Sequence, residues 1–292
     1  MPLDLIPLGG TFAREVRGVD LWRDLDDATI DALRRAWDEA GVLVFRRQAL
    51  DEAELVRFFS RFGEPDIIVR TDWQSRNRPE VIHISNMKDQ TGRSIGGLGA
   101  GELDWHTDQS YVANPATGAL LYMVESPAEG VPTYWANLRL AYAALPDETK
   151  QRIEGLQAVF DYLARQSTYD DEEPMSDELR ARTPPLLHPI VNTHPETGEK
   201  SLYLDPTTTT GIAGMPKMLG DPMLKALNEH AVSPEFIYRH DWQPGDVVMW
   251  DNGFLLHRRE AFDADASRWL KRLTIRLPGD RHVVPASKLV AA

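Results

Sequence analysis

The chain contains no cysteine among its 292 residues. It therefore has no disulfide, no thiolate metal site and no cysteine nucleophile, which removes several classes of enzyme. This absence is typical of a cytoplasmic protein, and we expect that location. Any metal ion must be bound by His, Asp or Glu side chains.

Positive charge and long apolar runs are also scarce. The 32 Lys and Arg residues face 45 Asp and Glu residues, which gives a formal net charge of -13. We expect no nucleic-acid partner, because contacts to phosphates need clustered Lys and Arg.

We also expect no membrane partner, because no apolar run approaches the ~20 residues of a membrane span. Residues 1–8 lack the basic and continuous apolar regions of a signal peptide. The sequence leaves a homo-oligomer open.

The remaining composition is that of an ordinary globular protein, with 42% apolar and 26% charged residues. We predict one domain over residues 1–292. Two segments within it have the composition of mobile lids. One lies at about 86–102 and is rich in glycine, and the other lies at about 166–185 and is polar and acidic. Solvated surface loops are the alternative for both segments.

Helical patterns come first along the chain. Asp26 can cap a helix that ends at Gly41, and Asp51 with Glu54 resembles the capping box of a second helix that ends at Gly63. From residue 81 onward, short apolar or alternating runs are separated by Gly, Pro and Asn, which indicates antiparallel strands. The candidate strands are 81–84, 119–124, 133–136, 186–192, 201–204, 236–239, 246–250 and 270–276. Short helices are expected near 141–156 and 222–230. The pattern predicts a mainly β fold with flanking helices, such as a barrel or a jelly roll.

Two separated motifs carry candidate metal ligands. His106 and Asp108 are two residues apart, so an extended strand would place both side chains on one face. His257 follows an apolar run far along the chain and can complete a set of two histidines and one carboxylate. Such a set suits several metals. On octahedral Fe(II) it leaves three positions open, which the activation of oxygen requires.

Arg268 follows the second motif and suggests an anionic ligand. A 2-oxoglutarate molecule that chelates iron through its keto acid end extends a second carboxylate away from the metal, and arginine can bind that carboxylate through two hydrogen bonds. Taken alone, Arg268 also fits a solvated position in a basic run. Thr133 alone is only a β-branched strand residue.

Together these motifs resemble the taurine dioxygenase and 2,4-dichlorophenoxyacetate dioxygenase family, whose members use Fe(II) and 2-oxoglutarate. The resemblance is carried by Trp105-His106-Thr107-Asp108, Thr133, Trp250-Asp251-Asn252, His257, Arg268 and Arg272. It extends in weaker form from about Leu21 to Gly279. It implies a double-stranded β-helix, a cupin-like jelly roll, formed by a single domain.

The resemblance also implies the roles of individual residues. His106, Asp108 and His257 would bind Fe(II). Arg268 and Thr133 would hold a carboxylate of 2-oxoglutarate. Arg272 would lie near this cosubstrate and near the anionic end of the substrate.

The implied reaction consumes 2-oxoglutarate and O2 and releases succinate and CO2, while an unactivated C–H bond of a small polar molecule is hydroxylated. Related halogenases carry a small residue in place of the carboxylate ligand, whereas Asp108 is retained here, so hydroxylation is favoured over halogenation. Desaturation, cyclisation and cleavage next to a heteroatom use the same ligands and stay open. Two more distant alternatives are a zinc hydrolase and a non-catalytic cupin-like binding protein.

The candidate substrate residues depart from the best-known members. Thr208 stands about where the family often has an aromatic residue. Glu102 stands where the taurine enzymes have an asparagine that contacts sulfonate, and a carboxylate would repel that group. We hypothesise that Glu102, Thr208 and Arg272 contact a polar substrate. A solvent-facing side chain is the alternative for Glu102.

Overall fold

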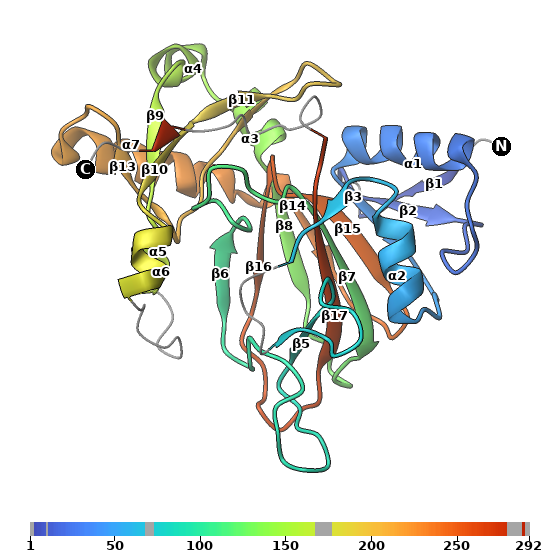
Figure 1. Cartoon of the computed structure of the whole chain (residues 1–292). Coiled ribbons are helices and arrows are strands. Elements are labelled where there is room, and N and C mark those ends of the chain that lie inside the picture. The colour runs from blue at the N-terminus through green and yellow to red at the C-terminus, as the bar shows by residue number, and fades with distance from the viewer. Residues whose placement is uncertain (1–2, 10, 68–72, 167–176, 279–287, 290–292) are drawn as a thin grey trace.

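The structure is a computed structural model that describes residues 3–9, 11–67, 73–166, 177–278 and 288–289. Strands make up the centre of the molecule, and helices flank them (Figure 1). Within the described ranges, no helix is both long enough and apolar enough to span a membrane.

The strands form two principal sheets, one large and one small. The large sheet has the order β1 (Asp4–Pro7), β2 (Arg14–Arg17), β3 (Val42–Phe45), β15 (Val247–Asp251), β7 (Gly118–Glu125), β17 (Trp269–Arg276) and β4 (Glu64–Pro65), and β5 (Ile82–Ser85) also pairs with β17. The small sheet has the order β14 (Ile237–His240), β8 (Thr133–Asn137), β16 (Leu255–Arg259) and β6 (Leu103–His106).

A further sheet and a hairpin lie beside them. This sheet has the order β13 (Thr209–Ile212), β9 (Gln157–Phe160), β10 (Leu186–Pro189) and β18 (Lys288–Leu289), and the hairpin consists of β11 (Val191–Thr193) and β12 (Lys200–Leu202). The helices are α1 (Asp27–Ala40), α2 (Glu52–Phe59), α3 (Leu138–Ala144), α4 (Asp147–Ile153), α5 (Tyr162–Gln166), α6 (Asp177–Arg182), α7 (Lys217–Ala231) and the 3-10 helix η2 (Pro234–Phe236).

An apolar core joins the two principal sheets face to face. Val248 and Trp250 of the large sheet share one buried cluster with Trp135 and Leu255 of the small sheet. The Trp135 and Trp250 rings lie 5.6 Å apart. Two sheets whose strands are antiparallel except for the parallel pair β2 and β3, closed on a common core, form a jelly roll. The predicted fold class is therefore confirmed.

Alternation along the strands builds a second core on the outer face of the large sheet. In β3, Val42 and Val44 face the inner core, whereas Leu43 and Phe45 pack in a separate cluster with α1 and α2. The period of two residues in a strand explains why one short apolar run serves both cores. In Figure 1, α1 and α2 cover this side of the molecule.

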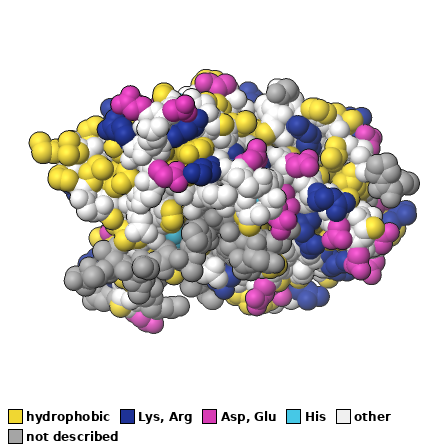
Figure 2. Space-filling view, turned by 90° about the horizontal axis from the view of Figure 1, so that it is seen from above, with side chains coloured by type: hydrophobic (Ala, Val, Ile, Leu, Met, Phe, Trp, Pro, Cys, Tyr) yellow, Lys and Arg dark blue, Asp and Glu magenta, His cyan; other side chains and the backbone are white. Residues whose placement is uncertain are grey.

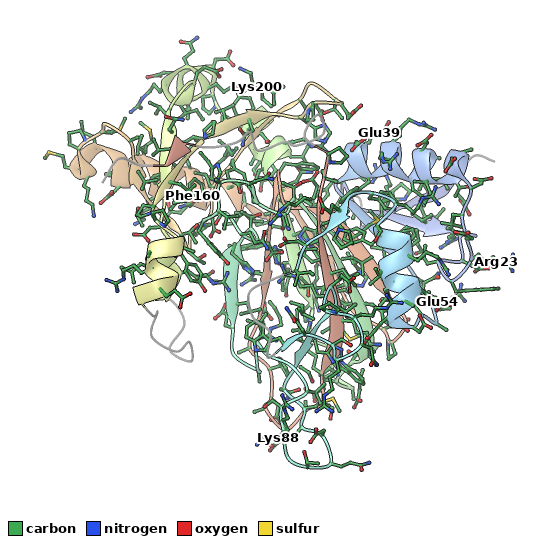
Figure 3. All side chains as sticks on the ribbon, viewed as in Figure 1. Arg23, Glu39, Glu54, Lys88, Phe160 and Lys200 are labelled. Carbon is green, nitrogen blue, oxygen red and sulfur yellow. The ribbon has the colours of Figure 1, made fainter. Side chains whose placement is uncertain are left out.

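A third core covers the small sheet on its outer side. Ala136 of β8 and Leu256 of β16 belong to a cluster that also contains Phe160 of β9 and Leu224 of α7. Figure 3 labels Phe160 beside this layer, above α5. Figure 2 shows apolar side chains gathered at the end of the molecule where α7 lies, and Met218 and Leu219 of α7 are 81% and 61% exposed.

Three of the four predicted ends of the N-terminal helices agree with the structure, whereas α2 ends at Phe59 with Ser60 as its C-cap, before the predicted Gly63. The Asp26 carboxylate accepts a hydrogen bond from the Thr29 amide at 2.8 Å, and Gly41 ends α1 with a φ of 75°. Asp51 and Glu54 form both hydrogen bonds of a capping box at α2. Side chains that satisfy the first free amides of a helix thus fix where these two helices begin.

Two other helix predictions were inexact. The helix expected near 141–156 is divided into α3 and α4, because Pro146 has no amide hydrogen and restricts Leu145 to an extended conformation. The helix expected near 222–230 begins earlier, at Lys217, and contains Pro222 in its interior.

The glycine-rich segment 86–102 is largely a hairpin. Asp89 N donates to Arg93 O at 2.8 Å, and Ile95 N donates to Met87 O at 3.0 Å. Figure 3 labels Lys88 in this segment, which extends away from the sheets. Much of the segment 166–185 lies outside the described residues. The single domain over 1–292 and the lid roles of both segments stay predictions.

One glycine in the large sheet is required by close packing. A Cβ atom added to Gly118 of β7 would lie 2.4 Å from Cγ1 of Ile275 and 3.0 Å from the ring of Trp37. By contrast, nothing lies within 4 Å of the position a Cβ atom would take at Gly211 of β13.

Candidate active site

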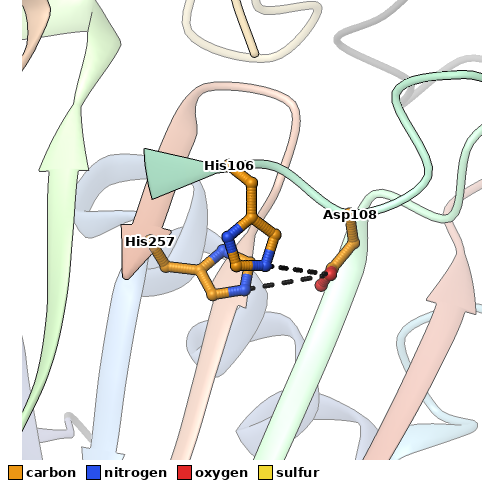
Figure 4. Close-up of side chains that lie close together, drawn as sticks. All are labelled: His106, Asp108 and His257. Carbon is orange, nitrogen blue, oxygen red and sulfur yellow. Dashed lines mark ion pairs between the residues drawn. The ribbon is translucent and has the colours of Figure 1, made fainter. Parts of the chain in front are cut away.

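Three predicted ligands converge in the small sheet. Nε2 of His257 lies 3.8 Å and Nε2 of His106 lies 4.0 Å from Oδ1 of Asp108. One potential ligand atom from each residue lies within 4.8 Å of the others, and all three residues are buried. Figure 4 shows the two imidazole rings directed toward the same carboxylate. This geometry can place three protein ligands on one face of a single metal ion.

Strand pairing explains how residues far apart in sequence meet. His106 ends β6 and is directly paired with His257 of the neighbouring strand β16. Asp108 lies just beyond β6. The hydroxyl of the preceding residue, Thr107, donates a hydrogen bond to Asn252 O at 2.8 Å. The ligands therefore belong to adjacent strands and to the turn that follows one of them.

The two histidines are arranged to be neutral ligands. Nδ1 of His106 donates to Asp104 O at 2.6 Å, which leaves Nε2 with a free lone pair toward Asp108. Burial lowers the pKa of His106, and it lowers the pKa of His257 well below the ordinary value. Neutral imidazole is the form that binds metal ions.

The carboxylate is held in its charged form. Burial by itself would raise the pKa of Asp108, but the positive charge and the hydrogen bond of Arg272 hold this pKa well below its usual range. The Arg272 guanidinium forms an ion pair with Oδ2 of Asp108. Asn252 donates its amide hydrogen to the same oxygen at 3.2 Å. Oδ1 of Asp108 therefore remains directed at the two histidines.

A pocket of about 440 Å³, including its open mouth, lies next to these ligands. Its lining contains every residue predicted to bind the cosubstrate, namely Thr133, Arg268 and Arg272. Its apolar walls come from Ile84, Leu98, Leu103, Leu121, Trp250 and Leu270. The pocket thus joins the metal ligands to several positive charges through an apolar passage.

Arg268 is a buried cation without an acidic partner in the described part of the chain. It is 3% exposed, and its Nε atom has no hydrogen-bond partner. Burial, with a smaller contribution from the charge of Arg259, lowers the pKa of Arg268 to about 9. The ring of Phe262 lies 5.8 Å from the guanidinium carbon. Burying a charge without a counter-charge is costly, so this position suits an anionic ligand.

Thr133 lies in β8 and is also buried. Its hydroxyl oxygen accepts a hydrogen bond from Nε1 of Trp242 at 2.9 Å.

The two residues predicted to contact only the substrate are placed differently. Glu102 is exposed, and one of its carboxylate oxygens lies 3.9 Å from Arg258. Thr208 is fully buried, and its hydroxyl lies 2.8 Å from that of Ser110, two residues after Asp108. Neither residue lines the pocket beside the metal ligands. Their roles stay predictions.

Several residues of this region were not assigned a role from the sequence. Asn252 belongs to the Trp-Asp-Asn motif, but nothing in that motif reveals its bond to Asp108. Arg259 donates hydrogen bonds to Leu98 O and Gly99 O at 3.1 and 3.0 Å and also to Gly101 O, so it holds the glycine-rich loop over the pocket. The sequence held one signal for this role: Arg259 follows His257 by two residues in one strand, so both side chains lie on the same face of the sheet.

Comparisons with known proteins agree with this geometry. The family model "Taurine catabolism dioxygenase TauD, TfdA family" matches residues 4–274. The chain is 35% identical to an alpha-ketoglutarate-dependent 2,4-dichlorophenoxyacetate dioxygenase of Cupriavidus pinatubonensis, over 92% of this chain and 96% of the relative. It is 30% identical to a pentalenolactone F synthase of Streptomyces avermitilis, over 94% and 93% of the two chains.

Solved structures of dioxygenases superpose on this chain over almost its whole length. The crystal structure of AAD-2 in complex with Mn(II) and N-oxalylglycine superposes with a TM-score of 0.80 at 30% identity, covering 95% of this chain and 98% of that chain. A taurine dioxygenase from Burkholderia xenovorans superposes with a TM-score of 0.80 at 31% identity, covering 100% and 97% of the two chains.

Proposed function

The chain belongs to the taurine catabolism dioxygenase TauD, TfdA family, and from that premise we propose that His106, Asp108 and His257 bind the Fe(II) of an α-ketoglutarate-dependent dioxygenase. Enzymes of this class act on small molecules with Fe(II), 2-oxoglutarate and O2, and this chain is one of them. Two neutral imidazoles and one carboxylate fit Fe(II) and leave positions free for other ligands.

One observation carries the assignment of the cosubstrate pocket: Arg268 is buried without an acidic partner among the described residues. In this proposal it binds the carboxylate of 2-oxoglutarate that points away from the metal, with Thr133 as a second contact. Apolar walls would then enclose the methylene carbons between the two ends of the cosubstrate. A zinc hydrolase leaves such a charge beside the candidate metal ligands unexplained.

Bound Fe(II), together with 2-oxoglutarate and O2, supplies the oxidant that attacks a C–H bond, and the cosubstrate becomes succinate and CO2. The protein positions the reactants and excludes water. Asp108 is kept as a charged ligand by Arg272 and Asn252. Because this carboxylate occupies a position that a halide would need, we propose hydroxylation as the outcome. Desaturation, cyclisation and cleavage next to a heteroatom remain alternatives at the same centre.

We propose a small polar substrate whose acidic end, where present, interacts with Arg272. Glu102 and Thr208 are the further candidates for substrate recognition. The Glu102→Gln variant should change the preference between amine-bearing and anionic candidates, as measured by turnover of paired substrates. Equal selectivity in the variant and the parent protein would remove Glu102 from the site.

The net charge of -13 supports our proposal that no nucleic acid takes part, and the lack of a long apolar run supports the same proposal for membranes. The lack of cysteine supports a cytoplasmic location. A homo-oligomer is compatible with the chain. Light scattering of the purified protein measures its oligomeric state directly.

The experiment that tests the proposed reaction is a screen for substrate-stimulated decarboxylation of 2-oxoglutarate under Fe(II), O2 and ascorbate. Mass analysis of the stimulating compound should reveal the gain of one oxygen atom. A loss of two hydrogen atoms would instead establish desaturation or cyclisation. A fragmented product would establish cleavage next to a heteroatom.

A further inference from the structure

A buried tryptophan fixes the proton of the predicted cosubstrate contact Thr133. Nε1 of Trp242 lies 2.9 Å from Oγ1 of Thr133, and the two residues are only 5% and 4% exposed. An indole N–H can only donate, whereas a hydroxyl can donate or accept. The Thr133 oxygen must therefore accept this bond, and its own hydrogen must be directed to a different acceptor.

The pocket is where that acceptor would lie. Thr133 lines the same pocket as Arg268. We propose that Trp242 acts as a positioning residue that turns the Thr133 hydroxyl into a hydrogen-bond donor for the cosubstrate carboxylate held by Arg268. This inference rests on the proposed function, because it takes that carboxylate as the acceptor.

The indole ring is itself held in place by a neighbouring histidine. The ring of His240 lies 4.5 Å from that of Trp242 at an interplanar angle of 80°. His240 is directly paired with Thr133 across β14 and β8. The strand that carries His240 therefore fixes the tryptophan relative to the threonine.

Both nitrogens of His240 are occupied, so this ring has one orientation. Nε2 lies 3.1 Å from Oδ2 of Asp246, a carboxylate oxygen that can only accept, and Nδ1 lies 2.8 Å from the Tyr238 hydroxyl. Nε2 must donate, and Nδ1 of the neutral ring accepts from Tyr238. Arg46 completes the arrangement with an ion pair to Asp246 at 2.5 Å. This buried network leaves the Trp242 ring little freedom.

The Thr133 hydroxyl is therefore oriented as a donor toward the pocket already in the ligand-free protein. Without the indole N–H, the Thr133 hydroxyl could rotate and would lose part of its preference for donating into the pocket. Binding of 2-oxoglutarate should then weaken by roughly fivefold to tenfold, within the range of one hydrogen bond to a charged group.

The test measures equilibrium binding and requires no knowledge of the substrate. Titration calorimetry without O2 gives the dissociation constants of 2-oxoglutarate and N-oxalylglycine for the Mn(II)-loaded protein. The variant is Trp242→Phe. The matched control is Trp135→Phe, because Trp135 is equally buried and neighbours Trp242, but its indole nitrogen has no hydrogen-bond partner in the described structure. Trp242→Phe should weaken both ligands, and Trp135→Phe should leave them within about twofold of the parent.

A double variant with Thr133 distinguishes a positioning role of Trp242 from a general loss of packing. In a Thr133→Val background, Trp242→Phe should have no further effect on the dissociation constant, because the hydroxyl that it orients is gone. Equal weakening in both backgrounds would contradict the proposal. If Trp242→Phe fails to fold, a benzothiophene analogue of tryptophan at this position keeps the ring shape and removes only the N–H donor.

An Arg268→Met arm distinguishes this inference from the proposed function. Weak binding in Arg268→Met together with parental binding in Trp242→Phe would refute the role of Trp242 and leave the cosubstrate pocket intact. Parental binding in both Arg268→Met and Thr133→Val would refute the pocket assignment itself.

Discussion

Replacing Arg268 with methionine should stabilise the ligand-free protein and weaken its binding of 2-oxoglutarate. The fall of the Arg268 pKa from 12.5 to about 9 corresponds to roughly 5 kcal/mol of destabilisation of the charged form in the folded state. Methionine has a similar length and no charge. We therefore expect the free energy of unfolding to rise by about 1–4 kcal/mol.

Binding should change in the opposite direction. Removal of one partner from a buried, charge-assisted contact costs roughly 2–5 kcal/mol, which is a loss of about 30-fold to several thousand-fold in affinity for 2-oxoglutarate. A residue that serves only the fold would not raise stability and lower affinity in the same variant.

Urea unfolding without cosubstrate and calorimetric titration of the Mn(II) protein measure the two quantities. The matched control is Arg276→Met at the far end of β17, the strand that begins one residue after Arg268, because Arg276 is 44% exposed in its side chain and pairs with Asp66 at 2.7 Å. This control should leave cosubstrate affinity unchanged and should not gain stability. An Arg268→Met protein that is less stable and still binds 2-oxoglutarate normally would show that Arg268 is a structural residue and not a cosubstrate contact.

The pH dependence of the parent protein provides a further check on Arg268. Its folded-state pKa of about 9 lies below the ordinary 12.5, so between these values the unfolded chain holds more protons at this group than the folded protein does. The contribution of Arg268 to stability therefore rises with pH above about 9, while affinity for 2-oxoglutarate falls. Both trends should be absent from Arg268→Met.

Three further predictions concern the metal, the loop and the core. In His257→Ala the affinity for Fe(II) and Mn(II), measured by equilibrium dialysis, should fall at least tenfold, while the circular dichroism spectrum stays that of the parent. Undiminished metal affinity would place the metal elsewhere. Arg259→Met should free the carbonyl groups of loop 98–101, so amide hydrogen exchange should accelerate there and not in the sheets, and unchanged exchange would show that Arg259 does not hold the loop. Gly118→Ala should lower the free energy of unfolding by about 1–3 kcal/mol through overpacking, whereas Gly211→Ala should stay within about 0.5 kcal/mol of the parent, and equal effects in urea unfolding would contradict the packing argument.

The fold class could be predicted because its signals are local. Alternating apolar runs indicated the strands, and Asp26 and Asp51 indicated where two helices begin. Each of these helices begins with a hydrogen bond between two residues three positions apart. The bounds of the short helices near 141–156 were less precise, because Pro146 separates α3 from α4 and only the whole range was predicted from the sequence.

The three candidate metal ligands could be chosen from the sequence because metal binding is restricted to a few residue types. With no cysteine in the chain, two histidines and a nearby carboxylate were already a narrow set. Pairing of His106 with His257 depends on the order of strands in the sheet, which resemblance to a family supplied and spacing alone did not.

The supporting residues could not be predicted, because their roles arise only from three-dimensional contacts. Trp242 reaches Thr133 from a distant part of the chain, and Asn252 reaches Asp108 in the same way. The burial that makes Arg268 informative is also a property of the folded chain, since charged residues such as Asp265 and Lys271 near it in sequence would equally suit an exposed arginine.

His106, Asp108 and His257 should together bind the iron of a 2-oxoglutarate-dependent dioxygenase. The most direct measurement is succinate formation from 2-oxoglutarate by the purified protein loaded with Fe(II) or with Zn(II), beside the His257→Ala variant. We predict succinate only with Fe(II), O2 and an intact His257. Turnover supported by Zn(II) without 2-oxoglutarate, or undiminished succinate formation by His257→Ala, would contradict the claim.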